Sequence, residues 1–229
     1  MDNKELLLEF GNRVFHGVSY DKKKVLQNGQ TIRLQGLDND HYLEIYFQSI
    51  RNSGNYATIS PYIAIKSKCT KAFEVQKFAS NSAEGLIFSE QIGYLSPRKE
   101  HKTWDVGESN IENATTDVLS IINMHITPFF QKINTKESLY SVIIEKSLAI
   151  NDYSTPSLKP LLYILANNHI EAATMALTEF FKSKNLATKG NALKLFQRLE
   201  SEQSIDIHTR EFQDANIIKM AYIMGVRIN

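Results

Sequence analysis

The sequence predicts an α+β protein in which a strand-rich first half is followed by an all-helical second half. Between residues 41 and 66, apolar and polar residues alternate with a period of two, which is typical of half-buried strands. After residue 109, apolar residues instead recur every three or four positions, as on an amphipathic helix. We therefore expect an N-terminal helix with an antiparallel β-meander, then a C-terminal helical bundle, divided into residues 1–133 and 134–229.

The first half begins with a predicted helix, because Leu6, Leu7, Phe10 and Val14 share one helical face before Gly17. Asn28 and Gly29 suit a tight turn between two short strands. Strands are then expected over 41–50 and 58–66, and Pro61 indicates that the second lies at an edge or carries a bulge. Two further strands are expected over 86–94 and 103–106.

The second half begins at Ser109 and Glu112, which match a capping box. Pro128 is expected to kink or interrupt the first helix of this half. Residues 151–156 have the composition of a linker that ends in an N-cap and a first-turn proline. Four or five amphipathic helices with short polar loops are expected in this half, with a break at Asn167 and Asn168.

Charge and composition restrict the classes of function. The formal net charge is +1 and neither half is strongly basic, which disfavours nucleic acid as a partner. Cys69 is the only cysteine, so no intrachain disulfide can form. No signal-peptide core is present near Leu6, and the apolar stretch 121–133 is broken by polar residues and Pro128. We therefore expect a cytoplasmic protein that makes no membrane contact.

Catalytic signatures are absent from the sequence. It has no glycine-rich phosphate loop, no H-E-x-x-H, no G-x-S-x-G and no C-x-x-C. Asp38, Asp40, His41 and Glu44 are the densest set of potential metal ligands, but Asp and Asn are also ordinary hairpin-turn residues, and we favour the turn. We expect no catalytic residue, cofactor or metal. The Lys22–Lys24 run and Lys66, Lys68, Lys71 and Lys77 fit either an acidic-partner surface or, as we favour, a solvated strand face.

The most distinctive stretch is 90–105, which combines a strand end, a charged loop and the only tryptophan. Tyr, Trp and Arg are the residues that most often anchor protein interfaces. The candidate partner-binding residues are Tyr94, Arg98, Lys99, His101 and Trp104. The alternative interpretation is that Tyr94 and Trp104 are cross-strand core partners and that 98–102 is a solvated loop tip.

Residues 1–133 also resemble a widespread bacterial domain family of unknown function. The resemblance rests on Ile92-Gly93-Tyr94-Leu95, the Pro97-containing charged loop, Trp104 and the meander that precedes them. Members of that family often lie near contact-dependent toxins, so the resemblance implies an immunity-like role. The sequence thus predicts a non-enzymatic protein that binds and occludes a partner protein. The alternative is a hydrolase or nuclease-like enzyme with a site at the junction of the two halves.

Overall fold

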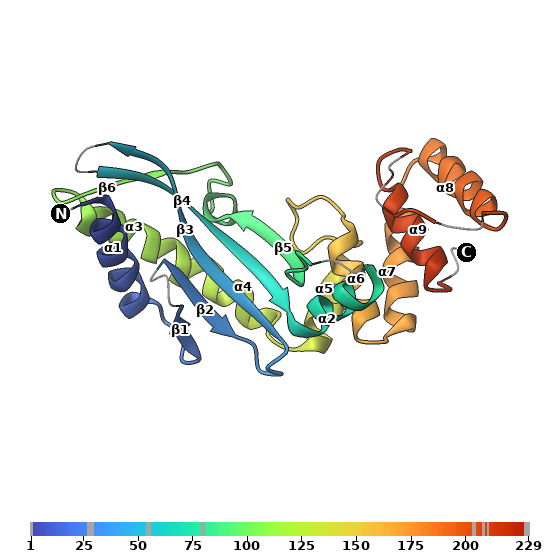
Figure 1. Cartoon of the computed structure of the whole chain (residues 1–229), viewed down its shortest axis with the longest axis horizontal. Helices are drawn as coiled ribbons and strands as arrows, with labels where there is room; N and C mark the ends of the chain where they lie inside the picture. Colours follow the sequence, from blue (N-terminus) through green and yellow to red (C-terminus); the bar gives the residue numbers. More distant parts are fainter. Residues whose placement is uncertain are drawn as a thin grey trace. The chain divides into compact units, whose positions relative to one another are not determined.

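The computed structural model describes residues 2–26, 30–53, 56–78, 81–202, 205–207, 209 and 211–226. The chain divides into two compact units: unit 1 comprises residues 1–68 and 88–136, and unit 2 comprises 69–87 and 137–229. An antiparallel sheet in the first half and helices in the second confirm the predicted α+β class (Figure 1). The predicted boundary between residues 133 and 134 stays a prediction.

Unit 1 contains one antiparallel sheet and the helices that cover it. Its elements are α1 (Asn3–Gly17), β1 (Lys23–Val25), β2 (Thr31–Gln35), β3 (His41–Ser53), β4 (Tyr56–Ser67), β5 (Leu86–Gln91, of which the first two residues belong to unit 2), the 3-10 turn η1 (Ile92–Leu95), β6 (Trp104–Gly107), α3 (Ile111–Ile121), the π-helical turn η2 (Ile122–Ile126) and α4 (Thr127–Lys132). The strand order is β1-β2-β3-β4-β5, with β6 also paired to β4.

The core of unit 1 lies between one sheet face and the helices. Leu43, Ile45 and Phe47 alternate along β3 and are buried, and Phe47 meets Phe10 of α1 edge-on at 5.3 Å between ring centroids. The capping box of this unit is at α1, where Asp2 accepts from the Glu5 N–H at 2.8 Å. The strands that flank the predicted Asn28–Gly29 turn are confirmed, while the turn itself lies outside the described residues.

Of the two alternatives predicted for Pro61, the edge strand is wrong, and the irregularity of this ladder is a register shift between Ser49 and Arg51 of the paired strand β3. Strand β4 is central, with β3 on one side and β5 and β6 on the other, and Pro61 pairs with Phe47. The Phe47 N–H donates instead to the Gln30 carbonyl at 3.1 Å. Because this pair exchanges no backbone bond across β3 and β4, the missing N–H of Pro61 costs that ladder nothing.

Two further details of the first half differ from expectation. Residues 68–78 form helix α2 (Lys68–Phe78), so Lys71 and Lys77 lie on a helix and not on a strand face. The predicted Ser109 capping box is also wrong, because α3 begins after Asn110, whose side chain accepts from the Gly107 N–H at 2.6 Å. The π-helical turn η2 directly precedes Pro128, which confirms an interruption there.

Unit 2 is mainly helical. Besides α2 it contains α5 (Lys136–Glu145), α6 (Leu158–Ala166), α7 (Ile170–Lys182), α8 (Leu186–Leu199) and α9 (Ala215–Ile223). The break at Asn167 and Asn168 is confirmed, with Asn168 at φ +56°. Pro156 is not a first-turn residue, because the N-cap of α6 is Ser157. No helix in the described part of the chain is long and apolar enough to span a bilayer.

Candidate protein-binding surface

The predicted surface lies on a loop that leaves the edge of the sheet. Strand β3 occupies one edge of β4, so β5 and β6 share the other edge. Strand β6 pairs with the Tyr56–Ile59 end of β4. Residues 92–103 connect β5 to β6. They therefore leave the edge of β4 where β5 ends and return to the same edge where β6 begins. We call this segment the 92–103 loop.

Gln91 closes the base of the 92–103 loop. Its side chain is buried; its carbonyl oxygen accepts from the Gly93 N–H at 2.8 Å and from the Lys102 N–H at 3.4 Å. Its amide nitrogen donates to the Lys102 carbonyl oxygen. One side chain thus satisfies backbone groups at both ends of the loop, which fixes the distance between them.

Gly93 is required where the two sides of the loop meet. A Cβ at this position would lie closer to the Glu100 carbonyl oxygen than any real Cβ contact, and 2.7 Å from the Gln91 side-chain oxygen. The turn is tightened by Ser96, which donates from its backbone N–H (3.1 Å) and its hydroxyl (2.6 Å) to the Gly93 carbonyl oxygen. Lys99, at φ +53°, then reverses the chain. The loop is therefore held by internal contacts.

Trp104 is a buried anchor beneath the loop. It is 6% exposed, and its indole N–H donates to Asp117 of α3 at 2.7 Å. Lys102 also contacts Asp117 at 2.5 Å and lies over the indole ring, 5.1 Å from its centroid. Burial alone raises the pKa of Asp117, but the hydrogen bonds from Lys102 and Trp104 outweigh it and lower that pKa below its ordinary value.

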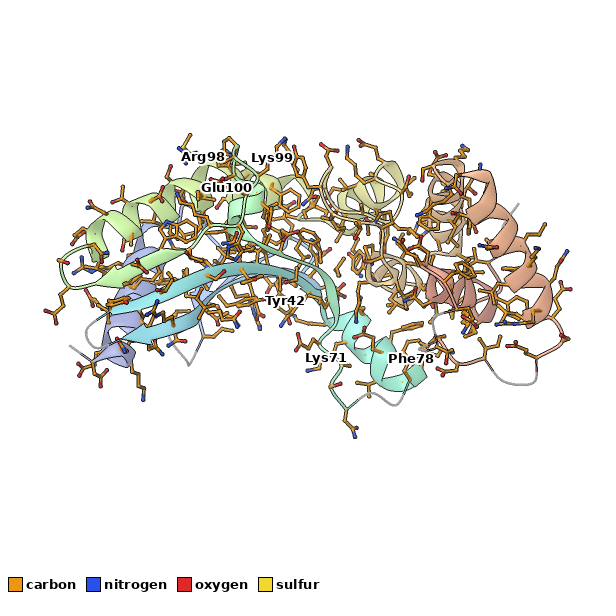
Figure 2. The ribbon with its side chains drawn as sticks, turned by 90° about the horizontal axis from the view of Figure 1, so that it is seen from above. Tyr42, Lys71, Phe78, Arg98, Lys99 and Glu100 are labelled. Carbon is orange, nitrogen blue, oxygen red and sulfur yellow. The ribbon has the colours of Figure 1, made fainter. Side chains whose placement is uncertain are left out.

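The other candidate residues lie on the outside of the loop. Arg98 is 80% exposed in its side chain, and its contact with Glu100 is a long 3.8 Å. Figure 2 shows Arg98, Lys99 and Glu100 together at the outer end of the loop. His101 is exposed and lies 3.5 Å from the hydroxyl of Ser60 on β4. The outer end of the loop therefore carries two cations, Arg98 and Lys99, and one carboxylate, that of Glu100.

Tyr94 and Trp104 are not cross-strand partners. Trp104 pairs with Ile59 of β4, whereas Tyr94 lies in η1 and is 36% exposed. Four of the five predicted residues thus lie toward solvent on the loop, and Trp104 lies below them. Its contribution to the candidate surface is to position Lys102 and the loop end.

A second set of residues on the sheet was not singled out by the sequence. Along β3, Tyr42, Glu44 and Tyr46 alternate with the buried residues and so lie on the face opposite the α1 core. Tyr46 stacks on Tyr62 of β4 at 5.9 Å between ring centroids. Tyr42 and Tyr46 occupy polar positions in the alternating pattern of β3. Because tyrosine is enriched at protein interfaces, these two residues could have indicated a binding surface from the sequence alone.

Glu44 is the centre of an ion-pair network on that sheet face. Arg33 of β2 contacts one carboxylate oxygen at 2.6 Å, and Lys66 of β4 contacts the other at 3.0 Å. Arg33 also lies over the Tyr42 ring, 4.0 Å from its centroid. Burial alone raises the pKa of Glu44, but the hydrogen bonds from Arg33 and Lys66 outweigh it and lower that pKa.

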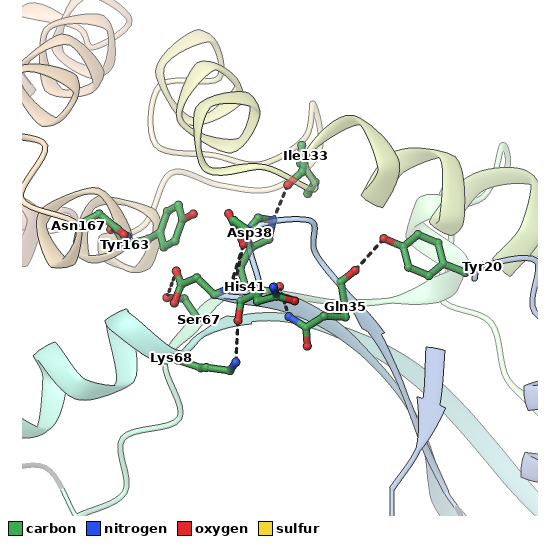
Figure 3. Close-up of polar contacts among 11 residues, drawn as sticks. Tyr20, Gln35, Asp38, His41, Ser67, Lys68, Ile133, Tyr163 and Asn167 are labelled. Atoms are coloured by element: carbon green, nitrogen blue, oxygen red, sulfur yellow. Dashed lines mark hydrogen bonds and ion pairs between the residues drawn. The ribbon is translucent and has the colours of Figure 1, made fainter. Parts of the chain in front are cut away.

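The candidate metal ligands Asp38, Asp40 and His41 form a structural turn, in which Figure 3 shows Asp38 and His41. The Asp38 side chain accepts from the Asp40 N–H at 3.0 Å and contacts His41 Nδ1 at 3.0 Å. The other ring nitrogen of His41 lies 2.7 Å from the Ile133 carbonyl oxygen, and Asp40 accepts from Ser67 at 2.9 Å. Asp38 and His41 resemble two members of a hydrolase triad, but the third position is a carbonyl and not a nucleophile.

Unit 2 contains a cavity of about 750 Å³ near the ends of α2, α6 and α9. Glu74, whose side chain is 7% exposed, lies in its wall, and both of its carboxylate oxygens are engaged. One contacts Lys159 at 3.1 Å, and the other accepts from the Gly85 N–H at 3.1 Å. The charge of Glu74 is thus neutralised by its neighbours; the wall also contains Glu84 and Asp214, and Asp214 contacts Lys184 at 2.8 Å. No group of three or more potential metal ligands occurs among the described residues.

Comparison of the chain with protein-family models, curated proteins and solved structures finds no match. The likeness of residues 1–133 to an immunity-like family therefore stays a prediction, as does the enzyme alternative. The functional proposal rests on the geometry of the loop and of the adjoining sheet face.

Proposed function

We propose that this protein is a non-enzymatic binding protein that occludes a partner protein, in the manner of an immunity or regulatory protein. The 92–103 loop forms the binding surface. The observation that carries the proposal is the construction of the loop. Gln91 and Gly93 hold its base, while Arg98, Lys99 and His101 extend from its outer end. A loop fixed before binding loses little conformational entropy on association.

Charge indicates the chemistry of the partner. On the outer loop, Arg98 and Lys99 are two cations beside one carboxylate, that of Glu100, which lies 3.8 Å from Arg98, while Lys102 is already paired with Asp117. A partner that presents Asp and Glu side chains would complement this surface and would be attracted to it at long range. Tyr94 adds a half-exposed aromatic ring that can bury apolar area at the centre of such a contact.

A photoreactive phenylalanine analogue at position 94 tests the proposal in cells of the source organism. Tyr94 is replaced ring for ring, and Tyr153, which is 50% exposed in unit 2, provides the matched control position. We expect one protein to be cross-linked from position 94 and not from position 153. The cross-link should weaken strongly when Arg98→Ala and Lys99→Ala are added.

The control for charge is Lys22→Ala with Lys24→Ala, which removes two exposed positive charges elsewhere in unit 1. That variant should cross-link as the parent does. Three outcomes would contradict the proposal. They are no protein cross-linked from position 94, equal cross-linking from position 153, or an equal loss of cross-linking in the Arg98→Ala/Lys99→Ala and Lys22→Ala/Lys24→Ala variants. The first would move attention to the enzyme alternative, for which a substrate screen is the next test.

A further inference from the structure

The segment from the end of α7 through α8 in unit 2 is strongly basic, although the chain as a whole is nearly neutral. Between Phe180 and Leu199 the sequence contains no Asp or Glu. Its basic residues are Lys182, Lys184, Lys189, Lys194 and Arg198. A stretch of charges of one sign, in a protein whose net charge is close to zero, creates a local electrostatic field that attracts groups of the opposite charge.

Two of these cations have no ion-pair partner among the described residues. Lys182 contacts Glu179 at 2.5 Å, Lys184 contacts Asp214 at 2.8 Å, and Arg198 contacts Glu202 at 2.8 Å and Glu211 at 2.5 Å. Lys189 and Lys194 form no such pair with any residue that the structure describes, and both are exposed on α8. They are therefore the positions where an external carboxylate would meet the least competition.

An apolar groove of about 340 Å³ lies beside Lys189. It is lined by Phe181 of α7 and by Ala192, Leu193 and Phe196 of α8, with Lys182 and Lys189 also in its wall. Its aromatic side chains pack against other rings. Phe181 packs edge-on against Phe180 at 5.1 Å between ring centroids, and Phe196 against Tyr222 of α9 at 5.0 Å. Leu193 is nonetheless 61% exposed. The groove thus combines a fixed apolar floor with a cationic rim.

We propose that this groove binds an acidic amphipathic helix of a partner protein. Apolar side chains spaced three and four positions apart on that helix would enter the groove and cover Leu193. Glu or Asp residues beside them would pair with Lys189 at the rim of the groove. This surface belongs to unit 2 and is independent of the 92–103 loop in unit 1, so either site can fail without the other.

The shape of the site favours a peptide over two other anionic partners. Nucleic acid binding draws mainly on contacts from cations to phosphates and gains little from a recessed apolar floor. A membrane-binding helix inserts protruding apolar side chains between lipids. Here Phe181 is buried, Phe196 is half-buried, and the space between the two helices is concave. A ligand that brings its own apolar side chains to the groove fits this arrangement best.

Display selection of an unbiased helical peptide library against the full chain tests the proposal. We expect enriched sequences with apolar residues at i, i+3 or i+4 and i+7, and with Glu or Asp between them. Binding of the enriched peptide is then measured by fluorescence polarisation. Leu193→Asp should weaken it about tenfold or more, because the charge would lie on the apolar floor. The matched control is Met175→Asp, an exposed apolar side chain on α7 outside the groove, which should change nothing.

Charge reversal separates pairing with Lys189 from a general charge effect. Lys189→Glu should weaken peptide binding about tenfold and flatten its salt dependence. Lys24→Glu makes the same change in net charge in unit 1 and should leave affinity unaltered. No enriched peptide, enriched peptides without this pattern, or equal losses in both reversals would overturn the proposal. Binding of a DNA duplex or of phosphatidylserine vesicles through Lys189, without peptide binding, would also overturn it.

Discussion

Glu44→Gln tests whether the ion-pair network on the open sheet face stabilises unit 1. The side chain of Glu44 is 9% exposed, and those of Arg33 and Lys66 are 22% and 19% exposed. The substitution preserves shape but removes the negative charge between two half-buried cations. A hydrogen bond between charged groups contributes about 1.5–3 kcal/mol. Of the two contacts that Glu44 makes, to Arg33 and to Lys66, the substitution removes one and weakens the other. We expect unit 1 to be destabilised by about 2–4 kcal/mol near neutral pH.

The pH dependence provides the sharper result. The pKa of Glu44 is lowered in the folded protein from its ordinary value of 4.5, so its stabilising contribution is complete above that value. It is lost as the pH falls through the lower, folded-state pKa. The difference between wild type and Glu44→Gln should therefore shrink in acid, because the protonated wild-type side chain has also lost its charge.

Urea unfolding followed by tryptophan fluorescence measures this effect, because Trp104 is the only tryptophan and lies in unit 1. Glu100→Gln is the control, since that side chain is 56% exposed and should change stability by less than about 0.5 kcal/mol. An unchanged midpoint in Glu44→Gln at neutral pH would refute the reasoning. So would a difference from wild type that stays constant from neutral pH into acid.

Three further substitutions have expected outcomes. Asp117→Asn should destabilise unit 1 by at most about 1 kcal/mol near neutral pH, since the carboxylate is 46% exposed. Because the pKa of Asp117 is lowered, the difference from wild type should fade in acid, as measured by urea unfolding followed by Trp104 fluorescence. His41→Ala should cost about 2–4 kcal/mol in the same assay, because the ring is fully buried and contacts the Ile133 carbonyl. Gly190→Ala should stabilise unit 2 by about 0.5–1 kcal/mol in thermal unfolding followed by circular dichroism, because a Cβ there meets nothing within 4 Å and alanine favours the helix.

The sequence predicted those parts of the fold in which residue period determines structure. Alternation of Leu43, Ile45 and Phe47 with polar residues was sufficient to place β3 and its buried face. Helix α2 was missed because only Thr70 and Glu74 on it are buried, so no apolar stripe marks it. Pro61 was misplaced because the direction of a missing N–H depends on the pairing register, which a local pattern does not contain.

The candidate loop was found through composition, and its construction was not. Tyr94, Arg98 and Trp104 are residue types that mark interfaces, and they drew attention to 90–105. The role of Gln91 depends on Lys102, eleven positions later, being folded back against it. The role of Gly93 depends on the Glu100 carbonyl in the same way. Such contacts arise from the path of the loop, so neither residue type nor spacing indicates them.

The affinity of the Gly93→Ala variant for the cross-linked partner tests the central claim most directly, because this change removes no exposed side chain. The added Cβ must displace the Glu100 carbonyl and with it the outer end of the loop. Trp104 fluorescence verifies that unit 1 remains folded, and Gly190→Ala, which adds the same methyl group in unit 2, is the control. By isothermal titration calorimetry we expect Gly93→Ala to bind at least about tenfold more weakly than wild type, and Gly190→Ala to bind normally. Wild-type affinity in folded Gly93→Ala would contradict the claim that the held 92–103 loop is the binding surface.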